Sequence, residues 1–100
     1  TRNNGAITDL PDDYILEIPA RIKKNGPTPV PLGACYPATT GLIHTIKNVE
    51  RLVINGYAAQ QDNLIKTAML IHPLGPKESQ LETLWRRLQQ ANRAIMSAAE

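Results

Sequence analysis

The spacing of apolar residues changes from a period of two to a helical period along the chain. Between Tyr14 and Ile22, apolar residues occupy every second position, which predicts a strand with one buried face. Pro19 cannot donate a backbone hydrogen bond, so this strand belongs at a sheet edge or a bulge. Asn25-Gly26 is typical of a tight hairpin turn, and a proline-rich return strand follows it up to Leu32. The pattern predicts an irregular two-stranded sheet edge over about residues 14–32.

From about residue 38 the apolar positions recur every three or four residues. This period predicts amphipathic helices over about residues 38–61, 62–71 and 79–98. The stripe of the first helix consists of Leu42, Ile46, Val49, Val53 and Tyr57, and that of the last helix of Leu81, Leu84, Trp85, Leu88, Ala91 and Ile95. Asp62 is a candidate N-cap, and Ser79 with Glu82 forms a candidate capping box. The expected fold class is therefore α+β.

Composition fits one folded domain, because 42% of the 100 residues are hydrophobic. The net charge is +2 and the basic residues are dispersed, which argues against a nucleic-acid partner. No apolar run approaches the roughly 20 residues that span a bilayer, so no membrane association is expected. The single cysteine fits a reducing compartment, and we therefore expect a cytoplasmic location.

The residues that could carry chemistry do not form a complete active site in the sequence. Cys35 and His44 are candidate soft metal ligands, but no second pair completes a tetrahedral set, and Cys35 is equally explained as a small apolar filler. His72 precedes a proline and is expected to serve a helix end. Asn3 and Asn4 precede Gly5, where side-chain amides suit either a turn or a bound ligand. We expect no catalytic, cofactor-binding or metal-binding residue in this chain.

Several short motifs follow one another in a distinctive order. They are "NNGAITDLPDDYILEIPARIKKNGPTPVPLGACYP", then "NVERLVINGYAAQQDNLIKTAMLIHPLG" and then a terminal amphipathic helix. This order resembles the C-terminal end of glycoside hydrolase family 4, the NAD- and manganese-dependent glycosidases. The positions that match the family pattern are Asn3, Gly5, Ile7, Leu10, Pro11, Asp13, Glu17, Pro19, Asn25, Gly26, Glu50, Leu52, Asp62, Ala68, Pro73 and Leu74.

The resemblance implies that residues 1–100 are the C-terminal segment of a substrate domain like that of lactate and malate dehydrogenases. The N-terminal dinucleotide-binding domain would be missing and would be this segment's partner, together with a sugar substrate and further copies in a homo-oligomer. NAD and Mn(II) would serve the complete enzyme, and none would bind this segment alone. The family's reaction is an oxidation at the sugar C3, removal of the C2 proton, elimination of the aglycone, water addition and return of the hydride. The substrate would be a 6-phospho-glucoside, a galactoside or a galacturonide.

Within this framework Asn3 and Asn4 are the residues expected to approach the sugar, and the isolated chain is expected to be inactive. Cys35 and His44 do not stand in the family's metal-binding motifs. The alternative is a small non-enzymatic α+β module that docks a partner through its last helix. A segment of a larger enzyme should expose a large apolar surface, whereas an independent module should not.

Overall fold

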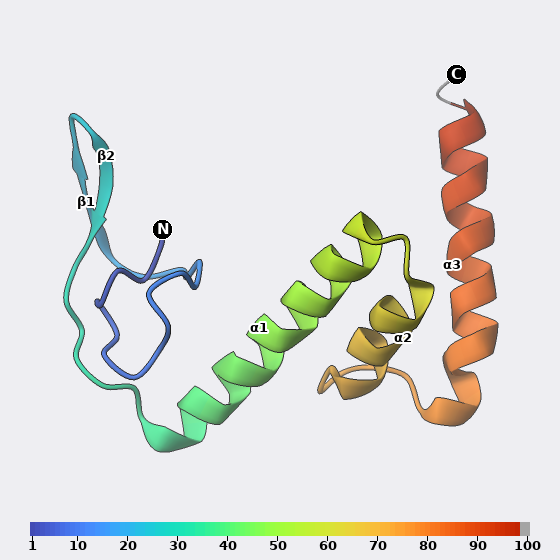
Figure 1. Ribbon diagram of the computed structural model, residues 1–100, viewed down its shortest axis with the longest axis horizontal. Coiled ribbons are helices and arrows are strands. Elements are labelled where there is room, and N and C mark those ends of the chain that lie inside the picture. The colour runs from blue at the N-terminus through green and yellow to red at the C-terminus, as the bar shows by residue number, and fades with distance from the viewer. Residues whose placement is uncertain (99–100) are drawn as a thin grey trace. The chain divides into compact units, whose positions relative to one another are not determined.

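The computed structural model describes residues 1–98 and contains two compact units (Figure 1). The first unit comprises Thr1–Lys47, and the second begins at Asn48. Helix α1 (Pro37–Ala58) starts in the first unit and ends in the second.

The first unit contains a short antiparallel hairpin, as the sequence predicts. Strands β1 (Ala20–Lys23) and β2 (Gly26–Pro29) pair with Ala20 opposite Pro29 and Lys23 opposite Gly26. Gly26 has a φ of 104°, a turn conformation that a residue with a Cβ rarely adopts. The paired strands are much shorter than the expected range of 14–32, because the prolines of the return strand cannot donate to a longer ladder.

The predicted alternation of burial holds over the first part of residues 14–22. Tyr14 is buried, Leu16 and Ile18 are half-buried, and the residues between them are exposed. The prediction is wrong for Ile22, which is 82% exposed in the two-stranded part of the hairpin. The small core of this unit consists of Ile7, Leu10 and Tyr14, with Leu16, Ile18, Cys35 and Ile43 packed against it.

The second unit is helical. It contains the end of α1, helix α2 (Asp62–Ile71) and helix α3 (Glu78–Ala98), against expected ranges of 38–61, 62–71 and 79–98. Helix α1 ends at Ala58, and Gln60 has a φ of 54°. Orphan carbonyls of the last turn are satisfied because Gln61 N donates to Gly56 O (2.8 Å) and Gln60 N donates to Tyr57 O (3.2 Å).

The helix starts differ from the predicted caps. Asp62 lies in the first turn of α2, and Gln61 is the N-cap residue without a side-chain capping bond. The predicted capping box is also wrong, because α3 already begins at Glu78. Gln80 Oε1 instead accepts a hydrogen bond from Lys77 N–H (3.2 Å), so a glutamine three residues into the helix satisfies the donor at its start.

His72 serves the end of α2, as expected. Its backbone N–H donates to Ala68 O, and its ring Nδ1 accepts from Leu74 N–H (3.0 Å). Among residues 1–98, no helix combines the length and the apolar content that a membrane span needs.

Two glycines of α1 provide a matched test of the packing between α1 and α2. A Cβ at Gly56 would lie 2.7 Å from Ile65 Cγ1 and 3.1 Å from Leu64 Cβ, whereas a Cβ at Gly41 meets no atom within 4 Å. We expect Gly56→Ala to destabilise the protein by about 1–2 kcal/mol through overpacking, despite the better helix propensity of alanine. Gly41→Ala should stabilise it by about 0.5–1 kcal/mol. Urea unfolding followed by circular dichroism measures both, and equal shifts of the two variants would contradict the close helix approach.

Candidate functional site

The N-terminal loop, residues 3–14, folds around the side chain of Asn3, which is fully buried. Asn3 Oδ1 accepts from Ile7 N–H at 2.8 Å. Asn3 Nδ2 donates to Ile7 O (2.9 Å), Leu10 O (2.9 Å) and Pro11 O (3.2 Å). Since an amide group has two N–H donors, one of them is shared between two carbonyls. The polar groups of Asn3 are thus used inside the loop.

Asn4 and Gly5 form an exposed turn at the surface of this loop. Both have positive φ, 46° for Asn4 and 77° for Gly5, and asparagine and glycine tolerate this conformation best. Asn4 N donates to Asp12 O at 3.1 Å, which fixes the turn and leaves the exposed Asn4 side chain on its outer surface. Of the two asparagines predicted to contact a sugar, Asn4 therefore has the accessible side chain.

Asp9 connects the loop to the start of α1. Its Oδ1 accepts from Cys35 N–H at 2.8 Å, and its Oδ2 accepts from the Thr40 hydroxyl at 3.2 Å. The backbone hydrogen bond from Cys35 lowers the pKa of Asp9, and the Thr40 hydroxyl and the nearby His44 act in the same direction. A charged Asp9 therefore stabilises the attachment of the loop to the segment that leads into the helix.

Tyr14 and His44 form a second connection between the loop and α1. The Tyr14 hydroxyl lies 3.1 Å from His44 Nδ1, and the two rings meet edge-on with centroids 5.7 Å apart. Cys35 is a half-buried free thiol that packs on the core of the first unit. Within the described part of the chain, no group of three or more His, Cys, Asp or Glu side chains could hold a metal ion.

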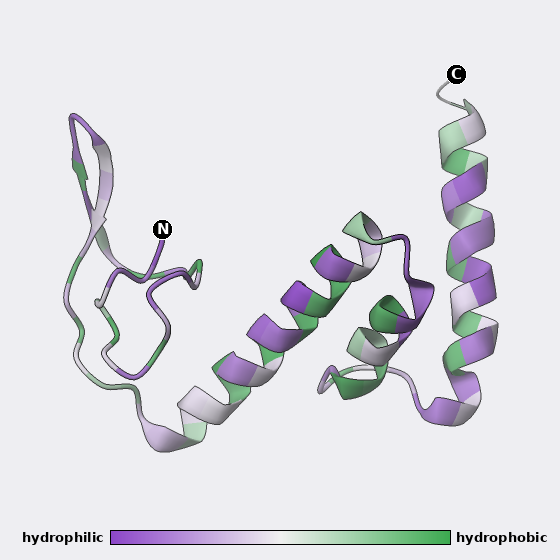
Figure 2. Cartoon of the chain, in the orientation of Figure 1, coloured by the Kyte–Doolittle hydropathy of each residue, from purple (hydrophilic) through white to green (hydrophobic). Residues whose placement is uncertain are grey.

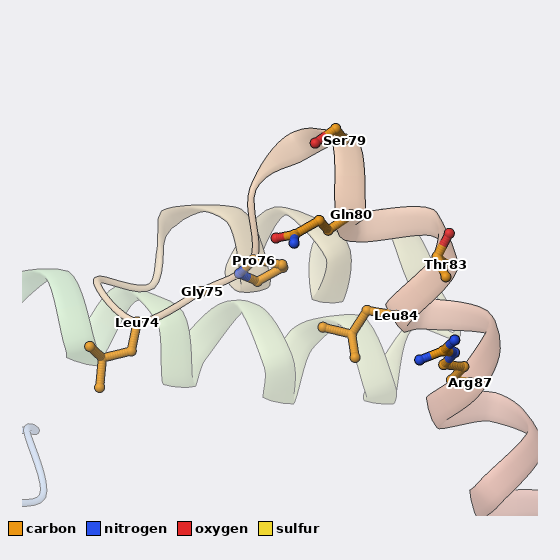
Figure 3. Close-up of a pocket in the computed structure, with 8 residues that line it drawn as sticks. All are labelled: Leu74, Gly75, Pro76, Ser79, Gln80, Thr83, Leu84 and Arg87. Atoms are coloured by element: carbon orange, nitrogen blue, oxygen red, sulfur yellow. The ribbon is translucent and has the colours of Figure 1, made fainter.

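The second unit has shallow hollows between its helices. One, of about 550 Å³, lies beside the loop before α3, where Leu84 and Arg87 line it together with Leu74 and Pro76 (Figure 3). Another, of about 520 Å³, has apolar walls from Ile65, Met69, Trp85 and Leu88 and a rim that includes Gln60, Asp62, Gln89 and Asn92. These hollows bring together no pair of groups suited to acid–base or nucleophilic catalysis.

Large apolar side chains are widely exposed on the helices, and apolar positions are visible along α1 and α3 in Figure 2. In the predicted stripe of α1, Leu42, Val53 and Tyr57 are exposed, and none of its five residues is buried. The buried apolar residues of the described chain are Ala6, Ile7, Leu10, Tyr14, Ala68 and Leu81. Exposure on this scale is typical of a surface that packs against further polypeptide.

Sequence comparison assigns the chain to a family. Residues 1–75 match the Family 4 glycosyl hydrolase C-terminal domain. The chain belongs to glycoside hydrolase family 4. This confirms the resemblance of the motif order, and the two-stranded sheet followed by three helices confirms the expected fold class.

Individual family 4 relatives agree with this assignment. The chain is 39% identical over 93 residues to 6-phospho-beta-glucosidase BglT of Thermotoga maritima and 30% identical over 96 residues to a probable 6-phospho-beta-glucosidase of Bacillus subtilis. It covers 22% of the length of each, with 93% and 96% of its own residues matched. The chain therefore spans less than a quarter of these relatives.

Solved structures of the Thermotoga maritima 6-phospho-beta glucosidase share the fold. One contains manganese, NAD⁺ and glucose-6-phosphate, and it superimposes with a TM-score of 0.87 at 38% identity. The match covers 94% of this chain and 24% of the enzyme chain. The comparisons thus do not support the alternative of a non-enzymatic module, and the exposed apolar surface agrees with a segment of a larger enzyme.

The sequence did not predict three long-range contacts of this family 4 segment. Asp9 contacts Cys35 and Thr40, which are 26 and 31 positions away, and Tyr14 contacts His44, which is 30 positions away. No short motif links positions this far apart. No local signal marked Asp9 for this role, because its partners lie near the start of α1, far along the sequence.

Asp9→Asn tests the connection between the loop and α1. Because the folded pKa of Asp9 is lowered, its charged form stabilises the fold above the unfolded pKa of about 4, and this contribution disappears as the pH falls through the folded pKa. We expect Asp9→Asn to lower the melting temperature at pH 7 and the difference from wild type to shrink below about pH 4. Glu17→Gln, at another exposed carboxylate, is the control. A pH-independent difference would show that the charge of Asp9 is not involved.

Proposed function

We propose that this chain forms part of the C-terminal domain of a glycosidase that hydrolyses 6-phosphorylated β-glucosides. The match of residues 1–75 to the family 4 C-terminal domain carries this proposal, and the 39% identity to a 6-phospho-beta-glucosidase supports the substrate class. The relatives are several times longer than this chain, so the activity belongs to the complete enzyme that contains it. The isolated chain is proposed to be inactive.

NAD and Mn(II) are proposed as cofactors of the complete enzyme, in line with the solved relative that contains both. The described residues do not fit either group, because they contain no cluster of three metal-binding side chains and no glycine-rich dinucleotide loop. We place the NAD site and the Mn(II) site in the rest of the enzyme. That part is proposed to include a dinucleotide-binding domain N-terminal to this segment. We also propose that the complete enzyme forms a homo-oligomer. A cytoplasmic location is proposed because the single cysteine of this chain is a free thiol, which fits a reducing compartment.

The residues of this chain are proposed to position the substrate and to have no catalytic role. Asn3 closes the loop by its four internal hydrogen bonds, and this closure holds the Asn4-Gly5 turn in its positive-φ conformation. Asn4 is proposed to contact the sugar, whereas Asn3 acts on that contact through the loop. The predicted direct contact of Asn3 is therefore replaced by a positioning role in this proposal.

Substrate class can be tested on the complete enzyme. We expect hydrolysis of p-nitrophenyl β-glucoside 6-phosphate in the presence of NAD⁺ and Mn²⁺, and at least 10-fold lower kcat/KM for the same glucoside without phosphate. A charge-assisted contact to phosphate, which contributes about 1.5–3 kcal/mol, accounts for such a ratio. Equal turnover of the two substrates would contradict the phosphorylated class, and no turnover of any glycoside would contradict the proposal.

Asn4→Ala in the complete enzyme tests the sugar contact. Loss of one hydrogen bond to an uncharged hydroxyl should reduce kcat/KM by about 3- to 10-fold, and the melting temperature should fall slightly because alanine tolerates the positive φ of Asn4 less well than asparagine does. Asn63→Ala is a suitable control, because Asn63 is also exposed but lies on α2 in the second unit. Unchanged kinetic constants for Asn4→Ala would rule out the contact.

A further inference from the structure

The apolar stripe of α3 is covered over its first half and exposed over its second half. Leu81 is buried, and Leu84 and Trp85 are half-buried. Farther along the same helix Leu88 is 41% exposed, Ile95 is 68% exposed and Met96 is 69% exposed. Burial thus falls along the helix although the helical spacing of the stripe continues.

The difference in helix length explains this loss of burial. Helix α2 has 10 residues and α3 has 21, which correspond to lengths of about 15 Å and about 31 Å. Lys66 of α2 lies against the beginning of α3, since its Nζ is 2.7 Å from Glu82 Oε1 and 5.8 Å from the Trp85 ring centroid. The start of α2, at Asp62, shares a hollow with Gln89 and Arg93.

Helix α3 therefore runs past the beginning of α2, as Figure 1 shows for these two neighbouring helices. The hollow at the start of α2 includes Arg93, and α3 continues beyond this residue to Ala98. The apolar residues of the last turns, Ile95 and Met96, lie beyond Arg93. A stripe of this kind is stabilised only if another segment covers it.

Charge distinguishes between the possible occupants. Residues 83–98 contain Arg86, Arg87 and Arg93 and no aspartate or glutamate. Arg87 lines one hollow beside Leu84, and Arg93 lines another beside Trp85, so the positive charges border the stripe on both sides. Two copies packed through this surface would bring arginines toward arginines, whereas an apolar surface with carboxylates at its rim would complement it.

We propose that the exposed half of the α3 stripe, Leu88, Ala91 and Ile95, together with the neighbouring Met96, packs against an apolar, carboxylate-rimmed surface of the same enzyme chain. This surface belongs to the part of the enzyme outside the present segment, which makes up more than three quarters of the relatives. The inference rests on one part of the proposed function, namely that this segment belongs to a longer polypeptide. It assigns α3 an intramolecular docking role between the C-terminal segment and the rest of the enzyme.

Ile95→Glu and Ala94→Glu in the complete enzyme form a matched pair. Both residues are exposed on α3 and both changes add one negative charge, but Ile95 belongs to the stripe and Ala94 does not. We expect Ile95→Glu to lower the melting temperature by about 5 °C or more, because a carboxylate would be placed in an apolar contact. Ala94→Glu should shift it by less than about 1 °C. Sedimentation velocity should show the same assembly size for both variants and the wild type.

Two results would overturn the proposal. Equal melting temperatures for the two variants would show that nothing covers the stripe, and a smaller assembly for Ile95→Glu would show that a second copy covers it. Hydrogen exchange of the wild-type enzyme provides a test that needs no variant. Amides of residues 89–98 should exchange as slowly as those of residues 81–86, and fast exchange, as in a frayed helix end, would also overturn the proposal.

Glycosidase activity of the wild type is measured alongside. Absence of activity together with a selective effect of Ile95→Glu would contradict the proposed function and leave the docking surface supported. Activity of the wild type together with equal melting temperatures of the two variants would support the proposed function and contradict the docking surface.

Discussion

The first unit of this chain depends on the buried side-chain amide of Asn3. The buried core residues of this unit, Ile7, Leu10 and Tyr14, all lie in residues 3–14, and the hydrogen bonds of the Asn3 side chain hold the loop that positions them. Asn3 pairs with Ile7 N–H and Leu10 O inside the loop, and it also donates to Ile7 O and Pro11 O, which accept from Leu10 N–H and Tyr14 N–H as well. Since an unsatisfied buried polar group costs about 1–3 kcal/mol, one asparagine decides whether this loop can close. Asp9 and Tyr14 then connect the closed loop to α1.

The second unit has a different constraint, because its helices present more apolar surface than they can cover. Ala68 and Leu81 are its buried apolar residues among those described, while Ile54, Tyr57 and Ile95 remain exposed. A chain that spans 22% of its relatives is expected to show such surfaces. Membership of family 4 and the uncovered stripes agree with the proposal that this segment completes its core against the rest of a longer family 4 polypeptide.

The sequence predicted those features that depend on local periodicity. Alternation placed Tyr14, Leu16 and Ile18 on one face, and the helical spacing located α2 and α3 within one residue of their starts. Features that depend on distant contacts were not predictable. The role of Asn3 depends on carbonyls up to eight residues away. The capping of α3 by Gln80 depends on the residue at which the preceding loop ends and the helix begins. Ile22 was misplaced because periodicity indicates which residues share a face and does not show whether another element covers that face.

The central claim is that the apolar faces of this chain are covered only in the complete enzyme. Fluorescence of the dye ANS, which binds exposed apolar surface, tests this claim most directly when the isolated 100-residue chain is compared with an equimolar amount of complete enzyme. We expect strong dye fluorescence with the isolated chain and several-fold weaker fluorescence with the complete enzyme. Equally weak fluorescence with both would contradict the claim, because the isolated chain would then cover its own apolar surface.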